Sequence, residues 1–206
     1  MIPFDDALRA RLAGNLVRHP RLTIDAGGRR RAAVALTVVP GEHGAAFWLC
    51  LRPSRLSEHA GQFALPGGRL DPGETAVHAA LRELDEELGV RLAEDQVLGM
   101  LDDYPTRSGY VITPVVVWGG DAPVPSPSAH EVEVLFAIGL EQLTRDDSPV
   151  FVAIPESDRP VVQLPTDVAT LHAPTAAVLL QFRCVGLDGH VGLRVDHLEQ
   201  PVFAWR

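Results

Sequence analysis

Residues 68–90 read GRLDPGETAVHAALRELDEELGV, and this stretch predicts a helix together with its chemistry. Thr75 is suited to cap a helix, and Gly89 stands where a left-handed residue commonly ends one. A helix over residues 75–88 is therefore expected. At about 100° per residue, four apolar side chains fall within an arc of about 60° and should face the core. They are Val77, Leu81, Leu84 and Leu88.

Three carboxylates share another face of this helix, those of Glu83, Glu86 and Glu87. Their i, i+3 and i+4 spacing makes them neighbours that repel one another by a few tenths of a kcal/mol per pair. They also lie near the carboxyl end of the helix, where the macrodipole disfavours anions. A hard divalent cation would reverse the sign of both effects. Oxygen ligands of this kind suit Mg²⁺, with Mn²⁺ as a substitute.

Two interpretations of these acids compete. On charge spacing alone, an ordinary solvated acidic helix face is the simpler explanation. The Gly67-Gly68 turn before the helix favours a metal site instead, because glycine lets backbone carbonyls and amides approach a metal or a phosphate closely.

The complete pattern resembles the Nudix box, Gly-x5-Glu-x7-Arg-Glu-hydrophobic-x-Glu-Glu-x-Gly-hydrophobic, and every position of the box is filled here. The resemblance implies a Nudix fold, an α/β/α sandwich with a mixed β-sheet and the Nudix loop-helix-loop. It also implies hydrolysis of a diphosphate bond in a small nucleotide, with Mg²⁺ as cofactor. Four metal ligands follow from it: the side chains of Glu83, Glu86 and Glu87 and the carbonyl of Gly67.

The same resemblance implies that Glu74 and Arg82 pair and brace the loop against the helix, supporting the ligands from behind. A pair between Arg82 and Glu86, four residues apart on the helix, is compatible with this. The general base is left open between a box glutamate, Glu86 or Glu87, and an acid outside the box. For the latter we favour Glu131, while Glu133 alternates with valines and is also explained as the solvent side of a strand.

Residues 48–68 resemble the segment that precedes the box in coenzyme A diphosphatases, and residues 104–116, 131–140 and 172–176 resemble later segments of that subfamily. This implies cleavage of coenzyme A or acyl-CoA to 3′,5′-ADP and a 4′-phosphopantetheine compound. The matching positions before the box are Leu49, Arg52, Gly61, Pro66, Gly67 and Gly68. The departures are Trp48 for Leu, Cys50 for Thr, Pro53 for Ser, Ser57 for Arg and Leu65 for Phe. Two alternatives stay open: hydrolysis of ADP-ribose, NADH or a noncanonical nucleotide, and a non-catalytic nucleotide sensor.

Candidate substrate contacts are basic or aromatic side chains outside the box. His59 can hydrogen-bond a phosphate or order its own loop. Tyr110 can stack on adenine, as can Tyr104, whereas core packing better explains Trp48. Three arginines can meet phosphates, although each is equally well explained as a surface arginine on a loop: Arg52, Arg55 and Arg107. The basic run Arg29-Arg30-Arg31 is read as a solvated loop, with phosphate binding as the alternative.

The rest of the chain predicts one domain over residues 1–206, with a helical extension over residues 1–20. Further helices are expected over residues 4–17, 140–143 and 175–182. Strands are expected over residues 32–40, 45–52, 63–65, 96–102, 110–118, 132–138 and 202–205, with two short extended runs within 151–164. This order favours a mixed sheet with helices on both faces.

Composition limits the partners. A net charge of −9 disfavours nucleic acid and anionic membranes, but a divalent metal can still supply local positive charge for a small anionic substrate. Only two cysteines are present, and no apolar run is long enough to span a bilayer. We therefore expect free thiols and a cytoplasmic protein, and leave a homodimer open.

Overall fold

The computed structural model describes residues 1–55, 61–120 and 124–205 of the chain. Its central sheet is built on β1 (Arg30–Gly41), which lies between β2 (Gly44–Leu51) and β7 (Tyr110–Trp118). β1 and β7 run parallel, from the pair Arg30 and Tyr110 to the pair Val38 and Trp118. β2 is antiparallel to β1 and follows it through a tight turn. The expected mixed sheet is thus confirmed.

Shorter strands extend this sheet on both sides. β8 (Val134–Gly139) and β3 (Phe63–Ala64) pair with β2, and β5 (Val97–Met100) and β6 (Tyr104–Pro105) pair with β7. β4 (Gly67–Arg69) pairs with the first half of β1. The glycine turn is therefore anchored to the middle of the sheet.

Side chains alternate between two buried layers along the central strands, as a period of two requires when both faces of a sheet are covered. On β1, Ala33 and Ala35 face one layer and Leu36 and Val38 the other. The first layer is covered by α2 (Ala76–Leu88), whose Ala79 and Ala80 are fully buried. Small residues on both sides let helix and sheet pack closely.

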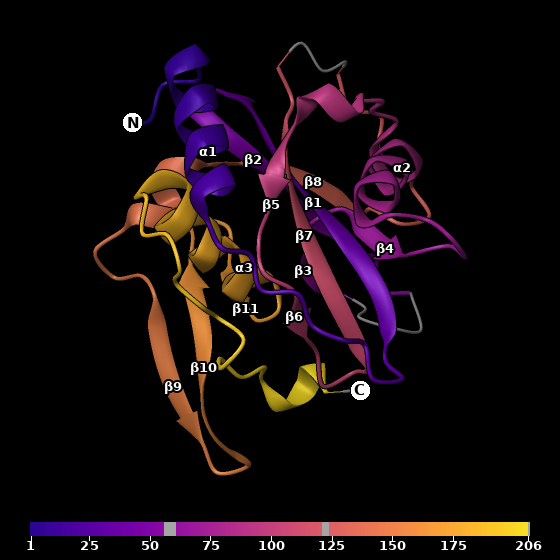
Figure 1. The fold of residues 1–206 in the computed structure, drawn as a ribbon, viewed down its shortest axis with the longest axis vertical. Helices are drawn as coiled ribbons and strands as arrows, with labels where there is room; N and C mark the ends of the chain where they lie inside the picture. The colour runs from indigo at the N-terminus through magenta and orange to yellow at the C-terminus, as the bar shows by residue number, and fades with distance from the viewer. Residues whose placement is uncertain (56–60, 121–123, 206) are drawn as a thin grey trace.

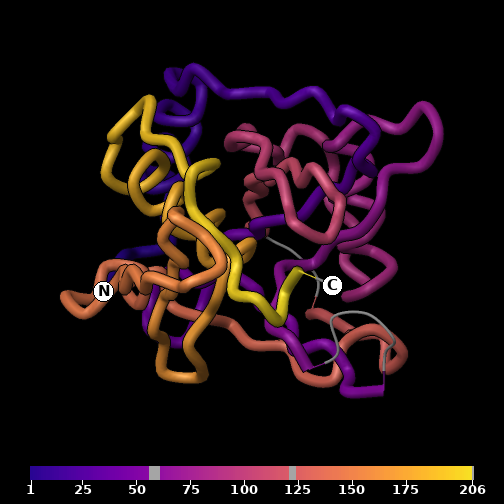
Figure 2. Tube along the Cα trace, turned by 90° about the horizontal axis from the view of Figure 1, so that it is seen from below, coloured from indigo at the N-terminus to yellow at the C-terminus, as the bar shows by residue number. Residues whose placement is uncertain are grey.

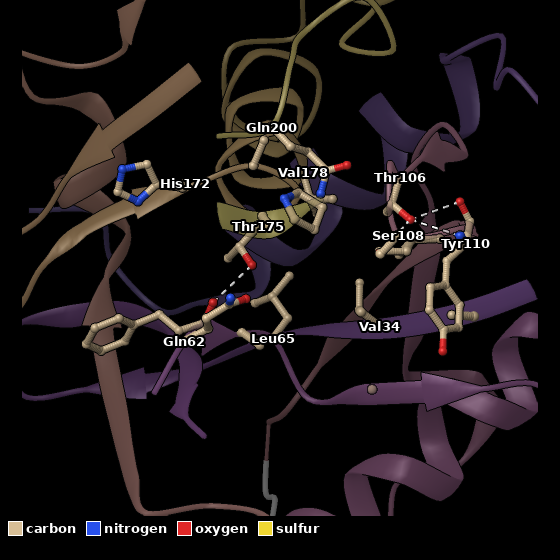
Figure 3. A pocket seen from close by; sticks show the side chains of 18 of the residues that line it. Val34, Gln62, Leu65, Thr106, Ser108, Tyr110, His172, Thr175, Val178 and Gln200 are labelled. Carbon is tan, nitrogen blue, oxygen red and sulfur yellow. Dashed lines mark hydrogen bonds between the residues drawn. The ribbon is translucent and has the colours of Figure 1, made fainter. Parts of the chain in front are cut away.

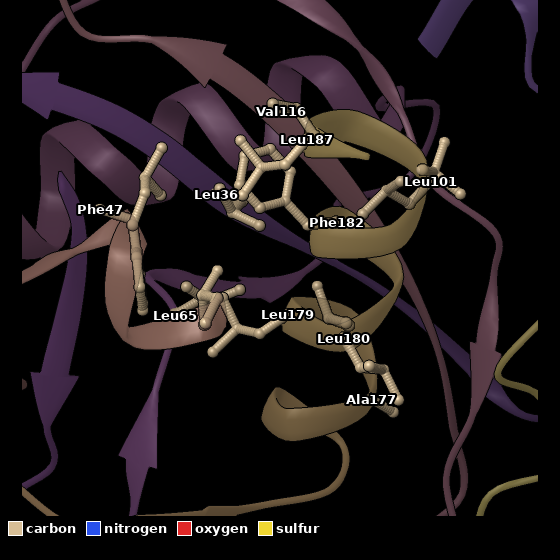
Figure 4. Packing of buried hydrophobic residues seen from close by; sticks show 14 of the residues in the cluster. Leu36, Phe47, Leu65, Leu101, Val116, Ala177, Leu179, Leu180, Phe182 and Leu187 are labelled. Carbon is tan, nitrogen blue, oxygen red and sulfur yellow. The ribbon is translucent and has the colours of Figure 1, made fainter. Parts of the chain in front are cut away.

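The opposite layer is covered by α1 (Asp6–Arg18) and α3 (Thr175–Gln181), which lie on the other side of the sheet from α2 (Figure 1). α3 is buried along its whole length and continues as a π-helical segment, Phe182–Leu187. Leu179 of α3 and Phe182 of this segment share one hydrophobic cluster with Leu36 and Phe47 of the sheet (Figure 4).

A second sheet was not foreseen. β9 (Val150–Ile154), β10 (Ser157–Pro165) and β11 (Thr170–His172) form an antiparallel sheet of their own, in order β11-β10-β9. The sequence indicated the two runs of the hairpin but not β11. In the part of the chain that the structure describes, short 3₁₀ helices span Glu94–Gln96, Leu140–Thr144 and Val202–Ala204.

The prediction of a last strand over residues 202–205 is wrong. Pro201 is followed by a 3₁₀ turn in which the amides of Ala204 and Trp205 donate to the carbonyls of Pro201 and Val202, at 2.9 and 3.2 Å. The apolar run over residues 202–205 was too short to separate a strand from a single helical turn.

Two buried carboxylates hold the terminal segments to the sheet. Asp102 accepts hydrogen bonds from the Leu22 amide, at 2.7 Å, and from Arg194, and its Oδ1 lies 2.9 Å from Nε2 of His19. Burial alone would raise its pKa, but these partners and Gln181 outweigh that effect and lower it. Asp103 binds Arg21 and the Ile24 amide in the same way.

The segment around Glu199 is fastened beside the second sheet, and in Figure 2 the yellow end of the chain runs next to the orange hairpin. Glu199 pairs with Val161 of β10 in a parallel bridge, and its amide donates to the Pro160 carbonyl at 2.8 Å. Its carboxylate binds Arg107 at 2.5 Å and Ser157 at 2.8 Å. These bonds fix the position of residues 200–204.

Acidification is expected to weaken this attachment through Glu199. Burial raises its pKa, but the bonds from Arg107, the Gln200 amide and Ser157 outweigh burial and lower the pKa to about 2 from an ordinary value of 4.5. A carboxylate of this kind stabilises the fold above its unfolded pKa and loses that contribution as the pH falls toward its folded pKa. Because Arg107 is half exposed, we expect the gap in unfolding free energy between wild type and Glu199→Gln to shrink by about 1–2 kcal/mol from pH 6 to pH 3. Urea titrations at both pH values measure it, and a gap independent of pH would contradict the assignment.

None of the helices in the described part of the chain has the length and apolar character needed to span a membrane.

Candidate active site

α2 carries the three clustered acids, and its local signals act as expected. The Thr75 hydroxyl accepts from the His78 amide at 3.2 Å, and Gly89 closes the helix with φ +65°. The buried arc, however, runs through Ala80, Leu84 and Leu88 and takes in Glu87, which is 5% exposed. Val77 and Leu81 of the predicted stripe are only half buried. The helix is therefore rotated so that one box acid enters the protein.

The glycine turn touches the acidic face of α2. A Cβ atom on Gly68 would lie 2.2 Å from Oε1 of Glu83, so a larger residue there would displace the Glu83 carboxylate from the turn. A Cβ atom on Gly67 would lie 2.3 Å from the Ala33 carbonyl on β1. The two glycines thus let the loop fit between the sheet and the helix.

Arg82 is the centre of a network that joins the loop to α2. Its guanidinium binds both carboxylate oxygens of Glu74, at 2.9 and 3.1 Å, and holds the pKa of Glu74 below its usual range. It also donates to Glu83 at 2.8 Å and to Glu86 at 2.9 Å. A fifth bond, of 3.0 Å, goes to the carbonyl of Arg69. Both pairings considered from the sequence, with Glu74 and with Glu86, are present together.

Glu87 is the most buried acid of the group. Desolvation raises the pKa of its carboxyl to about 8; Arg52, 3.7 Å away, opposes the rise, whereas Glu83 and Glu131 add to it. Desolvation also raises the pKa of Glu83, against the effect of Arg82. The positive charges of Arg52 and Arg82 therefore do not offset the cost of burying the carboxylates of Glu83 and Glu87.

These residues fit a divalent cation by their chemistry. The donors are carboxylate oxygens beside a glycine turn, the ligand type that hard cations prefer. Buried acids that repel one another gain most from such a charge. Across residues 1–55, 61–120 and 124–205, no three His, Cys, Asp or Glu side chains are already arranged as a coordination shell. Glu83 and Glu86 instead hydrogen-bond Arg82.

Glu131 lies in the turn before β8, outside the box. Its amide donates to the Ser128 carbonyl at 3.0 Å, and its side chain is exposed. Its charge reaches the site, because it contributes to the raised pKa of both Glu83 and Glu87. Glu133 is exposed as well, and its carboxylate accepts from the Ser54 amide at 3.3 Å.

A cavity of ≈540 Å³ opens beside the glycine turn. Gly67, Gly68 and Arg52 line it at the α2 side. In Figure 3, Tyr110, Thr106 and Ser108 lie at one end of the cavity and Gln62 and His172 at the other. Its apolar lining includes Val34, Phe63, Leu65, Ile112, Val178 and Phe203.

The predicted substrate contacts are divided by this geometry. Arg52 and Tyr110 line the cavity, whereas Arg55 and Arg107 do not. Arg55 is exposed and donates to the Ala129 carbonyl, and Arg107 binds Glu199 and stacks over the Trp205 ring at 4.9 Å. His59 lies outside the described residues.

Sequence reasoning missed the second wall of the cavity, which comes from residues 170–204. It comprises β11, the start of α3 and the turn at Gln200 and Phe203. The His172 ring meets the Phe203 ring edge-on, with centroids 5.3 Å apart. Residues 172–176 were predicted only to resemble a segment of coenzyme A diphosphatases. Nothing local in the sequence indicates that they line this cavity.

The model of the NUDIX domain matches residues 28–158. Nudix hydrolase 3 of Caenorhabditis elegans is 32% identical over 132 residues, covering 62% of this chain and 55% of that protein. The uncharacterized Nudix hydrolase NudL of an Escherichia coli O7:K1 strain is 36% identical over 129 residues, covering 60% and 64%. The chain thus spans less than two thirds of the length of these curated relatives.

Among solved structures, a MutT/nudix family protein from Enterococcus faecalis superimposes with a TM-score of 0.55 at 17% identity. The match covers 78% of this chain and 62% of that one. At this identity the likeness concerns the fold alone.

Proposed function

The chain belongs to the Nudix hydrolases, enzymes that cleave diphosphate bonds in small nucleotide substrates, and from this premise we propose that it hydrolyses coenzyme A or an acyl-CoA. Water would add across the diphosphate bridge, giving 3′,5′-ADP and a 4′-phosphopantetheine compound. One observation carries the proposal: the glycine turn, in contact with the acidic face of α2, also lines the cavity.

We assign the cofactor Mg²⁺, or Mn²⁺ in its place, to the three box acids Glu83, Glu86 and Glu87 with the Gly67 carbonyl. When bound, such an ion lowers the pKa of a coordinated water and neutralises phosphoryl oxygens. Arg82 and Glu74 position the acids, since the five bonds of Arg82 tie loop and helix together. Glu83 and Glu86, which accept hydrogen bonds from Arg82, are two of the groups that would hold the ion.

The remaining protein groups supply orientation and proton transfer. Arg52, beside Glu87 at the cavity lining, is placed to bind a phosphoryl oxygen. Glu131 is our choice of general base, because it is exposed to solvent and its charge acts on Glu83 and Glu87. Its carboxylate would take one proton from the attacking water.

The cavity supports a substrate with a charged half and an apolar half. Arg69 and the hydroxyls of Thr106, Ser108 and Tyr110 line one end, and the second wall adds Val178, Ala173 and Phe203. A nucleotide joined through a diphosphate to an extended apolar arm matches this division. A sugar in the place of that arm would leave apolar surface without a partner.

A substrate panel tests the assignment. With Mg²⁺ present, coenzyme A, acetyl-CoA, ADP-ribose and NADH are incubated with the enzyme and the products separated by HPLC. We expect kcat/KM for coenzyme A or acetyl-CoA to exceed that for ADP-ribose and NADH by about tenfold or more, since polar substrates leave the apolar wall unfilled. Turnover of ADP-ribose without turnover of either CoA compound would reject the substrate and keep the reaction.

A further inference from the structure

The structure points to a phosphate-binding cluster at the rim of the cavity, and we propose that it reads a phosphomonoester carried by the nucleotide half of the substrate. The cluster consists of Arg30, Arg69 and Tyr110. This inference rests on the proposed function, because it names a feature of the same ligand. It gives a role to part of the basic run at residues 29–31, which the reaction itself does not use.

Three adjacent strands bring the cluster together. Arg30 opens β1 and is the register partner of Tyr110 on β7, while Arg69 on β4 pairs opposite Ala32 of β1. The Arg30 guanidinium lies 4.2 Å from the centroid of the Tyr110 ring, and that of Arg69 lies 5.6 Å from it. Two cations are thus held around one aromatic ring.

The Tyr110 hydroxyl and the Arg30 guanidinium of the cluster can donate hydrogen bonds to a ligand. Arg69 Nε donates to the Tyr110 hydroxyl at 2.9 Å, which leaves the phenol proton able to bind an acceptor. Across residues 1–55, 61–120 and 124–205, Arg30 forms no ion pair. In a chain with net charge −9, the Arg30 guanidinium, which lies over Tyr110 beside Arg69, favours an anionic ligand.

The position of the cluster beside the glycine turn indicates which anion it binds. Arg69 directly follows Gly68, and its carbonyl accepts from Arg82 at 3.0 Å, so the cluster is one residue from the acidic site. Arg69 and Tyr110 line the same cavity as Gly67 and Gly68. A ligand whose diphosphate lies at the glycine turn would place a further phosphate of its nucleotide here. Guanidinium forks and a hydroxyl suit the oxygens of a phosphomonoester.

Calorimetric titration of the full chain with two product-like nucleotides, in EDTA and without metal, tests this. We expect wild type to bind 3′,5′-ADP about tenfold more tightly than 5′-AMP, as charge-assisted hydrogen bonds to one extra phosphate would give. Arg30→Gln should reduce the ratio to below about threefold, and Tyr110→Phe should reduce it in part. The control Arg29→Gln removes the same charge one residue earlier and should keep the ratio.

Equal affinity of wild type for the two nucleotides, or an unchanged ratio in Arg30→Gln, would overturn the cluster. So would a failure of either nucleotide to bind. None of these results would contradict the proposed reaction. The substrate panel tests that reaction separately, with the wild-type enzyme. Circular dichroism of each variant shows that a lost ratio is not lost folding.

Discussion

Glu87→Gln should lower kcat by on the order of a thousandfold or more while the protein stays folded. The amide keeps the shape of the side chain but removes the charge that the proposed cation needs. Because Glu87 is buried with its pKa raised to about 8, its carboxyl is mostly protonated at pH 7 without metal, and a neutral amide of the same shape replaces it at little cost. The midpoint of thermal unfolding without metal is therefore expected to stay the same or to rise.

A matched control lies on the same helix. Asp85, between the box acids in sequence, pairs with Arg91 at 2.8 Å on the surface. Asp85→Asn carries the same change of charge and should alter kcat by less than about twofold, as a surface ion pair would. If Glu87→Gln kept wild-type turnover under saturating Mg²⁺, the metal assignment would be wrong.

Arg82→Lys should lower kcat/KM by about a hundredfold, the range seen when groups that orient metal ligands are removed. Lysine keeps the positive charge but has no planar fork, so it cannot bind both oxygens of Glu74 and also reach Glu83, Glu86 and the Arg69 carbonyl. Titration with Mn²⁺, followed by water-proton relaxation, should show weaker metal binding. That readout separates a positioning role from simple loss of folding.

Arg91→Lys is the control for this variant. Its side chain is 85% exposed and its one ion pair, with Asp85, lies on the surface. We expect unchanged metal affinity and activity. Wild-type metal affinity in Arg82→Lys would show that the Arg82 network supports stability and not the cation site.

The sequence predicted α2 well because its signals are local. The Thr75 cap, the Gly89 end and the period of Leu84 and Leu88 all act within one helix. The central strands were found for a similar reason: two buried faces require the apolar runs that mark β1 and β7. The pairing of Arg82 with Glu74 was expected from family resemblance and not from spacing.

What the sequence could not give depends on contacts between distant segments. Phe203 reaches the cavity because Glu199 is bound by Arg107 and Ser157, and no pattern near Phe203 records those bonds. Arg107 was predicted to bind phosphate because a guanidinium can bind two oxygens at once. The same geometry lets it bind both carboxylate oxygens of Glu199. Glu87 is buried only because the helix is rotated against the sheet, which depends on small side chains such as Ala33 and Ala79.

The parallel pairing of β1 with β7 also sets the earliest time at which the central sheet can fold during synthesis. The two strands are neighbours from Arg30 with Tyr110 to Val38 with Trp118, so loop closure over about eighty residues precedes their first contact. During synthesis, β1 and β2 would emerge first as a hairpin, and the apolar faces of that hairpin would stay exposed to solvent until β7 is made. Binding competence would come later still, once residue 203 has left the ribosome, and chaperone demand should be greatest in that interval.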